Sequence, residues 1–274
     1  MNRIFRWIAI LVVPGCAQME PISPLAPLER SLIFHPTDYP ERVPTIPGLT
    51  VEEAWIETDN GTIHGLYASH PNPAGVALFC HGNAGTAAHR IESLAVLNQR
   101  HRLSVLIFDY QGFGKSSGKP TQSGILDDAR SARKWLADRE SIAESEVILM
   151  GRSLGGAVAV DLASEDGAKG LILASTFTSL PDVASHHFKW LTAHLLMTHR
   201  LNSLDKIKHY DGPLLCSHGD KDEVIPFELG EQLFEAAPGR KQFIRIPEGT
   251  HNSQMTEEYR QEFETFITSL SSRP

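Results

Sequence analysis

The sequence has few cysteines, few aromatic residues and no long apolar run. Its three cysteines form no Cys-x-x-Cys pair, which argues against a disulfide framework and against a zinc or redox site of that type. Lys and Arg number 25 against 33 Asp and Glu, and this acidic balance argues against nucleic-acid binding, which needs basic residues to neutralise phosphates. The 274 residues, 41% of them hydrophobic, predict one enzyme-sized globular domain.

The first sixteen residues are typical of an export signal. Arg3 and Arg6 precede the apolar run Trp7–Val13, which is too short to span a bilayer because spanning needs about 20 residues. Val13-Pro14-Gly15-Cys16 then resembles the lipobox of bacterial lipoproteins, in which the cysteine is lipidated and becomes the mature N-terminus. We therefore expect residues 1–15 to be a signal peptide and Cys16 to carry lipid. A plain secretory signal and an uncleaved N-terminal anchor are the alternatives.

The lipobox resemblance implies a membrane-anchored protein of the bacterial cell envelope that faces the periplasm. Ala17, instead of aspartate after the cysteine, favours the outer membrane if the cell is Gram-negative. Residues 17–50 contain seven prolines, and proline fixes φ and removes a hydrogen-bond donor. We expect these residues to form a semi-rigid spacer and a segment that lies along the domain surface.

Residues 51–274 show an alternation of strand and helix patterns. Val51–Thr58 and Thr62–Ala68 flank an Asn-Gly turn, which predicts an antiparallel hairpin. Later apolar runs, separated by helical patterns, are typical of strands buried on both faces: Val76–Cys80, Leu103–Phe108, Glu146–Met150, Gly170–Ala174, Pro213–Ser217 and Gln242–Ile246. This alternation predicts right-handed crossovers and an α/β fold with a mostly parallel, doubly wound sheet.

A Gly-x-Ser-x-Gly motif at residues 151–155 carries the strongest chemical signal. It follows the apolar run Val147–Met150 and precedes a helical pattern rich in small residues. In this context the motif predicts a nucleophile elbow, in which Ser153 lies on a strained strand-to-helix turn and the glycines leave room for the neighbouring backbone. The N–H of Leu154, next in the chain, would donate to the oxyanion.

A nucleophilic serine needs a base and an acid that orients the base. In the chain order typical of this elbow, the acid follows the serine and the histidine follows the acid. Asp222 and His251 both come after apolar strands, and no other histidine follows Asp222. Asp220 is the rival acid, only two residues away.

Several motifs together resemble the α/β-hydrolase superfamily, and within it the BEM46, ABHD13 and ABHD17 group of membrane-associated serine hydrolases. The resemblance extends from about residue 31 to the C-terminus and rests on residues 32–36, 81–85, 108–116, 151–156 and 218–226. It implies an α/β-hydrolase fold in which Ser153 is the nucleophile, Asp222 the acid and His251 the base. It also implies that the Asn83 N–H is the second oxyanion donor. Gln111 departs from the arginine that these relatives usually carry.

Residues 177–209 occupy the position of a small helical cap in this fold. Apolar side chains are frequent there: Phe188, Trp190, Leu191, Leu195, Leu196, Met197 and Leu201. They either line an apolar pocket for an acyl chain or pack against the sheet.

Other patterns carry less weight. Residues 112–117 resemble the end of a phosphate loop, but the glycine that such a loop needs is replaced by Asp109. The histidines at 186, 187, 194 and 199 are not spaced to share a helix face, so we expect no metal site. Cys80 and Cys216 are strand residues whose pairing the sequence leaves open.

The expected activity is therefore cleavage of carboxylic esters or thioesters in a small-molecule or acylated substrate, through an acyl-enzyme and without a cofactor. Three alternatives stay open: a serine peptidase, a cofactor-free perhydrolase, and a lipoprotein scaffold that retains the fold without catalysis.

The lipobox generates the first prediction. In a bacterium that processes lipoproteins, the mature chain should begin at Cys16 and carry acyl chains, which mass spectrometry will detect. The protein should also pellet with membranes, because each buried methylene contributes about 0.8 kcal/mol of binding. The Cys16→Ser variant should carry no lipid, and a wild-type mature chain that begins at another residue would contradict the prediction.

Overall fold

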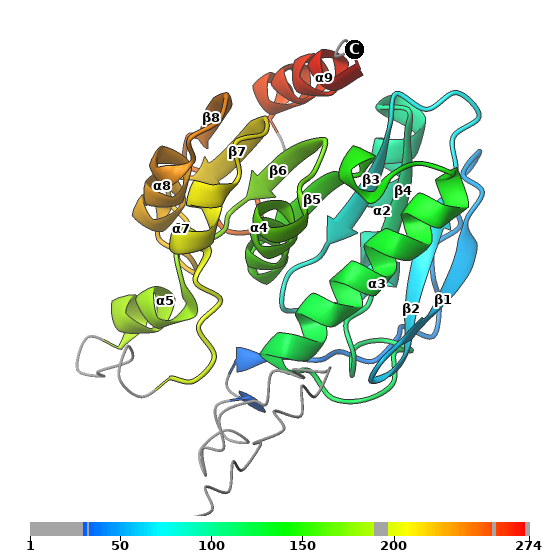
Figure 1. The fold of residues 1–274 in the computed structure, drawn as a ribbon, viewed down its shortest axis with the longest axis horizontal. Helices are drawn as coiled ribbons and strands as arrows, with labels where there is room; N and C mark the ends of the chain where they lie inside the picture. The colour runs from blue at the N-terminus through cyan, green and yellow to red at the C-terminus, as the bar shows by residue number, and fades with distance from the viewer. Residues whose placement is uncertain (1–29, 32, 189–196, 254–255, 272–274) are drawn as a thin grey trace, which may run out of the picture.

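A computed structural model describes residues 30–31, 33–188, 197–253 and 256–271 of the chain. Its centre is an eight-stranded sheet with the order β1-β2-β4-β3-β5-β6-β7-β8 (Figure 1). The strands are β1 Glu52–Thr58, β2 Gly61–Ala68, β3 Gly75–Cys80, β4 Leu103–Phe108, β5 Ile148–Arg152, β6 Gly170–Ala174, β7 Leu214–Gly219 and β8 Lys241–Ile246. The α-helices are α2 Ile91–Ala95, α3 Gln122–Glu140, α4 Leu154–Asp166, α5 Leu180–His187, α7 Ser203–Lys206, α8 Phe227–Ala236 and α9 Glu257–Ser271, and a 3₁₀ helix covers Ala87–Arg90.

The pairing of the strands confirms the predicted fold class. β1 pairs with β2, and β2 with β4, in antiparallel fashion, whereas every later pair is parallel. Two strands end two residues later than the apolar runs indicated, and β5 also begins two residues later, at Ile148. β5 extends to Arg152, which pairs with Ala174, and β7 extends to Gly219, which pairs with Ile246. Both extensions are made by polar or small residues, whose place in a ladder depends on the neighbouring strand.

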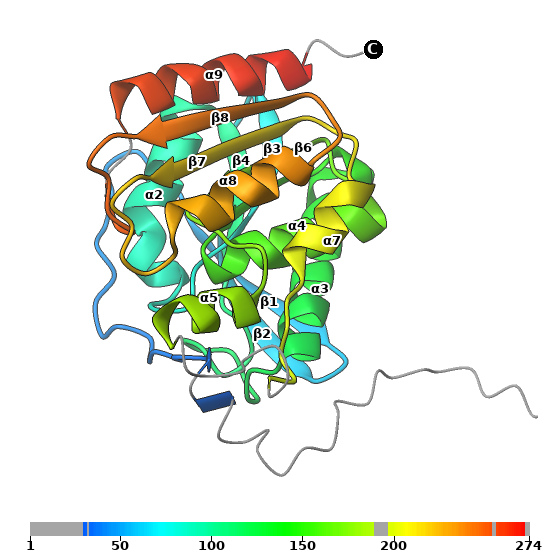
Figure 2. The same ribbon diagram turned by 90° about the vertical axis from the view of Figure 1, so that its left-hand side faces the viewer.

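Helices cover both faces of the sheet (Figures 1 and 2). α3, α4 and α8 lie on one face, and α2 and α9 lie on the other. Successive strand side chains point to opposite faces, so Leu106 and Phe108 of β4 pack on the first side while Val105 and Ile107 pack on the second. Two apolar cores result, one on each face.

α3 illustrates how the sequence directs a single element. The Thr121 side chain caps its start by accepting the Gly124 N–H at 3.0 Å, and Ser141 ends it in the left-handed conformation with φ 56°. The residues that recur at helical spacing are all buried against the sheet: Ile125, Ala129, Ala132 and Leu136.

The strand order decides whether the two strand cysteines can pair. Cys80 ends β3 and Cys216 lies in β7, with β5 and β6 between them. Neighbouring strands lie about 4.8 Å apart, so the two residues are about 14 Å apart, far beyond the reach of a disulfide. Both are buried free thiols.

Part of the predicted N-terminal and cap organisation lies outside the described residues. This applies to the signal peptide, to Cys16 and to the cap residues Trp190, Leu191, Leu195 and Leu196. Of the remaining cap residues, Phe188 is exposed and Leu201 is buried in the core. Within the described ranges, no helix combines the length and the apolar character needed to cross a membrane.

Candidate active site

Ser153 lies in a strained turn between β5 and α4. Its φ of 54° and ψ of −121° are unusual for a residue with a Cβ, as expected for a nucleophile elbow. The turn needs glycine on both sides. A Cβ on Gly155 would lie 2.0 Å from the Cys80 carbonyl oxygen, and a Cβ on Gly151 would lie 2.3 Å from the Gly155 carbonyl oxygen.

Hydrogen bonds from two neighbouring segments hold this turn in place. The Ser153 N–H donates to the Ala174 carbonyl at 3.0 Å, and the Thr176 hydroxyl donates to the Ser153 carbonyl at 2.9 Å. The strain is therefore maintained by the surrounding structure, while Ser153 as a residue stays partly exposed.

The structure brings His251 and Asp222 into direct contact. His251 follows β8 and Asp222 follows β7, and the two strands are neighbours in the sheet. His251 Nδ1 lies 2.8 Å from Asp222 Oδ2, so Nδ1 carries the proton and Nε2 is left as the basic nitrogen. The other oxygen, Oδ1, accepts the N–H groups of Val224 and Ile225 at 2.9 and 2.8 Å.

A second histidine, His218, also faces this carboxylate. Its Nε2 lies 3.3 Å from Asp222 Oδ2 and 3.0 Å from the Ile225 carbonyl oxygen, so Nε2 must carry the proton. The sequence did not predict this role, because His218 stood out only as the first residue of the motif at residues 218–226. Burial raises the pKa of Asp222, but hydrogen bonds from His218, His251 and the Ile225 N–H outweigh that effect and hold it well below its usual range.

The rival acid, Asp220, has other partners. Its Oδ1 accepts the Glu248 N–H at 2.7 Å, and its Oδ2 accepts the Arg245 Nε–H at 3.0 Å. These bonds tie the loop after β7 to the end of β8. Of the two aspartates, only Asp222 contacts the histidine.

The loop after β3 runs beside Ser153. A Cβ on Gly82 would lie 3.4 Å from Ser153 Cβ and 3.9 Å from its Oγ, so this backbone passes close to the hydroxyl. The side chain of Asn83 is engaged elsewhere: its Oδ1 accepts the His35 N–H at 3.1 Å and its Nδ2 donates to the Ile33 carbonyl. Asn83 can therefore serve the oxyanion only through its backbone N–H.

The segment at residues 33–38 holds this loop from outside the sheet. Besides the two bonds to Asn83, Thr37 Oγ1 accepts the Gly85 N–H at 3.1 Å, and its carbonyl accepts the Gly114 N–H at 2.9 Å. Sequence analysis placed these residues on the domain surface but missed the contact with the loop. The pairing joins residues about fifty positions apart, and only the resemblance in residues 32–36 pointed to this segment.

The buried carboxylate of Asp109 supports the loop after β3 from the protein interior. Asp109 Oδ1 accepts the Ala87 N–H at 2.7 Å and lies 3.4 Å from His81 Nε2, while its Oδ2 lies 3.6 Å from His64 Nδ1. Burial raises the pKa of Asp109, but the two histidines and the Ala87 N–H lower it overall. His81 also donates through Nδ1 to the Gly82 carbonyl at 2.6 Å. His81 is thus a hydrogen-bonding support for the loop.

Arg152 connects the elbow to the histidine loop. Its Nη2 donates to the His251 carbonyl and to Asn252 Oδ1, the latter at 3.1 Å. In the described residues, Ser153 Oγ makes no hydrogen bond to His251. Such catalytic hydrogen bonds are often long without substrate and tighten in the complex.

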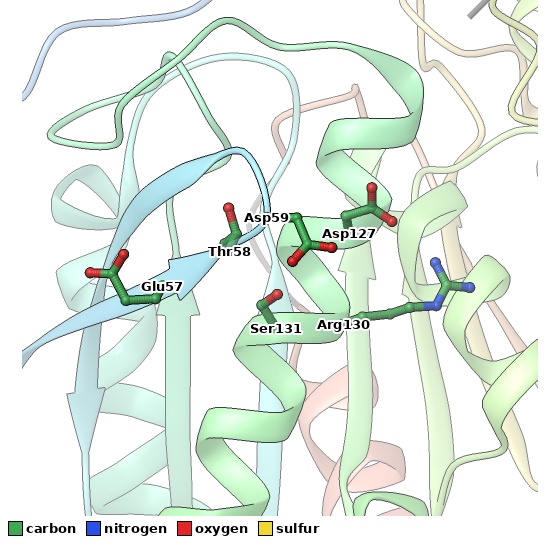
Figure 3. A pocket seen from close by; sticks show the side chains of 6 residues that line it. All are labelled: Glu57, Thr58, Asp59, Asp127, Arg130 and Ser131. Carbon is green, nitrogen blue, oxygen red and sulfur yellow. The ribbon is translucent and has the colours of Figure 1, made fainter. Parts of the chain in front are cut away.

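A surface hollow lies elsewhere, between the β1–β2 turn and α3 (Figure 3). Its volume is about 380 Å³, and it is lined by Glu57, Thr58, Asp59, Asp127, Arg130 and Ser131. None of the predicted site residues lines it. The part of the chain that the structure describes contains no cluster of three His, Cys, Asp or Glu side chains suited to a metal ion.

The chain is similar in sequence to one protein family and to several known proteins. The profile of the family described as serine aminopeptidase, S33, within the α/β hydrolases, matches residues 71–209. A protein of Mycobacterium tuberculosis is 35% identical over 229 residues, which cover 82% of this chain and 80% of the relative. The Schizosaccharomyces pombe protein bem46 is 30% identical over 240 residues, covering 82% of this chain and 80% of its own.

Among solved structures, the esterase Pf2001 of Pyrococcus furiosus has a similar fold. The TM-score is 0.66 at 19% sequence identity, and the match covers 85% of this chain and 98% of the esterase. At this identity the likeness shows the shared fold.

The approach of Gly155 to the end of β3 predicts a loss of stability on substitution. In Gly155→Ala, the new methyl group would collide with the backbone of Cys80 and His81, and overpacking of this kind lowers the free energy of unfolding by about 1–3 kcal/mol. Urea unfolding measures the change. Gly167→Ala is the control, because a Cβ there meets nothing within 4 Å and brings only the strain of φ 74°. An unchanged unfolding midpoint for Gly155→Ala would contradict the prediction.

His218 generates a kinetic prediction. In His218→Phe an aromatic ring remains but the donor to Asp222 is lost, so the pKa of the Asp222 carboxyl should rise. We expect kcat/KM for an ester to fall about tenfold, as for loss of one hydrogen bond to a charged group, and its acid limb to move to higher pH. The value of kcat/KM should fall less in His218→Gln, which keeps a hydrogen-bond donor. It should not change in His209→Gln, because His209 is exposed. A His218→Phe profile that falls uniformly at all pH values would indicate a structural role alone.

Proposed function

Because this chain belongs to the α/β-hydrolase family, we propose that it is a serine hydrolase that cleaves carboxylic esters or thioesters through an acyl-enzyme on Ser153. The observation that carries the proposal is the 2.8 Å contact of His251 with Asp222 at the sheet edge where Ser153 lies in a strained, partly exposed turn. A buried acid that stays ionised, a base that it orients and an exposed hydroxyl are the three parts that nucleophilic acyl transfer needs.

The reaction would begin when His251 Nε2 takes the proton of the Ser153 hydroxyl as Oγ attacks the carbonyl carbon. The imidazolium that forms is stabilised by Asp222, whose low pKa keeps it charged without taking the proton. His251 then gives its proton to the leaving oxygen or sulfur, and the acyl group stays on Ser153. Water, deprotonated by the same nitrogen, attacks the acyl-enzyme and releases the acid.

Backbone N–H groups would hold the oxyanion. Leu154 begins α4, so its N–H has no carbonyl one turn earlier in the helix to bind and lies at the positive end of the helix dipole. Asn83 offers the second N–H from the loop that passes Ser153 at Gly82. The bonds from Ile33, His35 and Thr37 keep that loop in position before substrate arrives, which is the preorganisation that such a site requires.

The lipobox supports a proposal about location. If Cys16 carries the lipid, the 17 residues that follow it up to Ile33 would reach at most about 61 Å when fully extended. Ile33 is bonded to Asn83, so the active site would work close to the membrane surface. Acylated substrates at that surface fit this placement.

Active-site labelling tests the proposed function. A fluorophosphonate probe should label the wild-type protein, and Ser153→Ala should abolish labelling and lower kcat for a p-nitrophenyl ester by at least about a thousandfold. Ser217→Ala is the control, because it removes a different serine hydroxyl, a buried one close to the acid loop, and should keep both labelling and hydrolysis. Folded wild-type protein that is not labelled would overturn the proposal and favour a non-catalytic scaffold.

The description of the matching family favours a second candidate, an aminopeptidase-like hydrolase with the same triad. Aminoacyl p-nitroanilides and p-nitrophenyl esters of equal size separate the two candidates in one assay. We expect the ester to be cleaved faster. Hydrolysis of the anilide without hydrolysis of the ester would support the peptidase instead.

A further inference from the structure

Two arginines contact two different loops of the proposed active site. Arg152, directly before Ser153, reaches the histidine loop, where its Nη2 donates to the His251 carbonyl and to Asn252. We call residues 81–86, between β3 and the 3₁₀ helix, the oxyanion loop. Arg90 ends this 3₁₀ helix, and its Nη2 donates to the Ala84 carbonyl at 2.8 Å. A Cβ on Gly85 would lie 3.5 Å from both terminal nitrogens of Arg90, so this guanidinium rests on the loop next to Asn83.

Neither guanidinium is neutralised by a neighbour. Across the described ranges, no carboxylate lies within 4.0 Å of Arg90 or Arg152. Other arginines of the domain do have such partners: Arg130 with Asp161 at 2.8 Å, Arg139 with Glu52 at 2.6 Å and Arg245 with Asp220 at 3.0 Å. The two acids that act on this pair over a longer range are Asp109 and Asp222, each already held by two histidines.

Holding these charges together is unfavourable for the free protein. Both side chains are partly buried, burial lowers the pKa of both guanidinium groups, and the charge of Arg90 lowers that of Arg152 further. Arginine nevertheless stays protonated, so two positive charges remain, one on the residue before Ser153 and one on the loop that contains Asn83, in a chain whose net charge is −8. Each guanidinium has donors beyond those already engaged, because only Nη2 of each makes a bond within the described residues.

We propose that Arg90 and Arg152 form a subsite for an anionic group of the substrate, a carboxylate or a phosphate close to the ester or thioester that is cleaved. The planar fork of donors on a guanidinium matches both groups. An anion between the oxyanion loop and the histidine loop would offset the repulsion between the two arginines. This subsite rests on the proposed function and narrows its substrate class from esters in general to anionic esters.

Matched substrates test the subsite. The first pair is mono-p-nitrophenyl glutarate and p-nitrophenyl pentanoate, which share the leaving group and the acyl length but differ in a terminal carboxylate. The second pair is 4-acetoxyphenyl phosphate and 4-methoxyphenyl acetate, which carry the difference on the alcohol side. We expect the wild type to prefer the anionic member of at least one pair by about tenfold in kcat/KM, the effect of one hydrogen bond to a charged group. The pair that shows the preference identifies the anion and its side.

For each variant, the measured quantity is the ratio of kcat/KM for the anionic ester to kcat/KM for the neutral ester. Arg90→Gln should bring this ratio close to one; losing its hydrogen bond to the Ala84 carbonyl can slow both esters, and a loss shared by both esters cancels in the ratio. Arg152→Gln should bring the ratio close to one as well, with some loss on both esters because its bond to the histidine loop is also lost. Arg102→Gln is the control: Arg102 also donates to a backbone carbonyl, that of Asn72, but lies at the opposite edge of the sheet.

A binding measurement separates failure of this proposal from failure of the proposed function. Titration calorimetry with glutarate and with phenyl phosphate should detect binding of one of them to the wild type and much weaker binding to Arg90→Gln. A wild type that hydrolyses the neutral esters without preference and binds neither anion would overturn the subsite alone. A wild type that binds the anion but is not labelled at Ser153 would support the subsite and overturn the proposed function. A preference that survives in both arginine variants would also overturn the subsite.

Discussion

The close approach of α4 to the end of β3 is the constraint on which the rest of the site depends. At Gly155 the helix backbone lies so near the carbonyls of Cys80 and His81 that no side chain fits between them. This contact brings the turn at Ser153 beside the loop at Gly82, which is why one backbone segment carries the proposed nucleophile and its neighbour carries an oxyanion donor. The strain at Ser153 is stable only because β6 and Thr176 hold the turn from the other side.

Charge in this region follows a repeated arrangement. Asp222 and Asp109 are buried carboxylates that each lie between two histidines; Asp222 accepts two backbone N–H groups and Asp109 accepts one. Hydrogen bonds to the ionised form keep both pKa values low despite burial, so both acids stay charged at neutral pH. One carboxylate orients the proposed base, and the other supports the oxyanion loop. Over a longer range, Asp109 acts on Arg90 and Asp222 acts on Arg152, and neither arginine has an ion-pair partner within the described residues.

If Cys16 is lipidated, the N-terminal segment would join the lipid anchor to the proposed active site. Residues 33–38 contact the oxyanion loop at Asn83 and Gly85, and they contact the loop after β4 at Gly114. A tether that begins at Cys16 would therefore end on a catalytic loop and not on a remote surface. This placement fits a hydrolase whose substrates are presented at a membrane, and it gives the proline-rich region a role beyond that of a spacer.

The sequence by itself determined the fold class and the elbow, because strand and helix periodicity and the glycine requirement of a strained turn are local properties. The tertiary structure decided which acid serves His251, since Asp220 and Asp222 differ only in the direction that the loop gives each side chain. It also decided that Cys80 and Cys216 stay apart, because strand order is not encoded in any one strand. The roles of His218, Ile33 and Arg152 depend on partners that only the assembled sheet brings within hydrogen-bonding distance, so no local pattern reveals them.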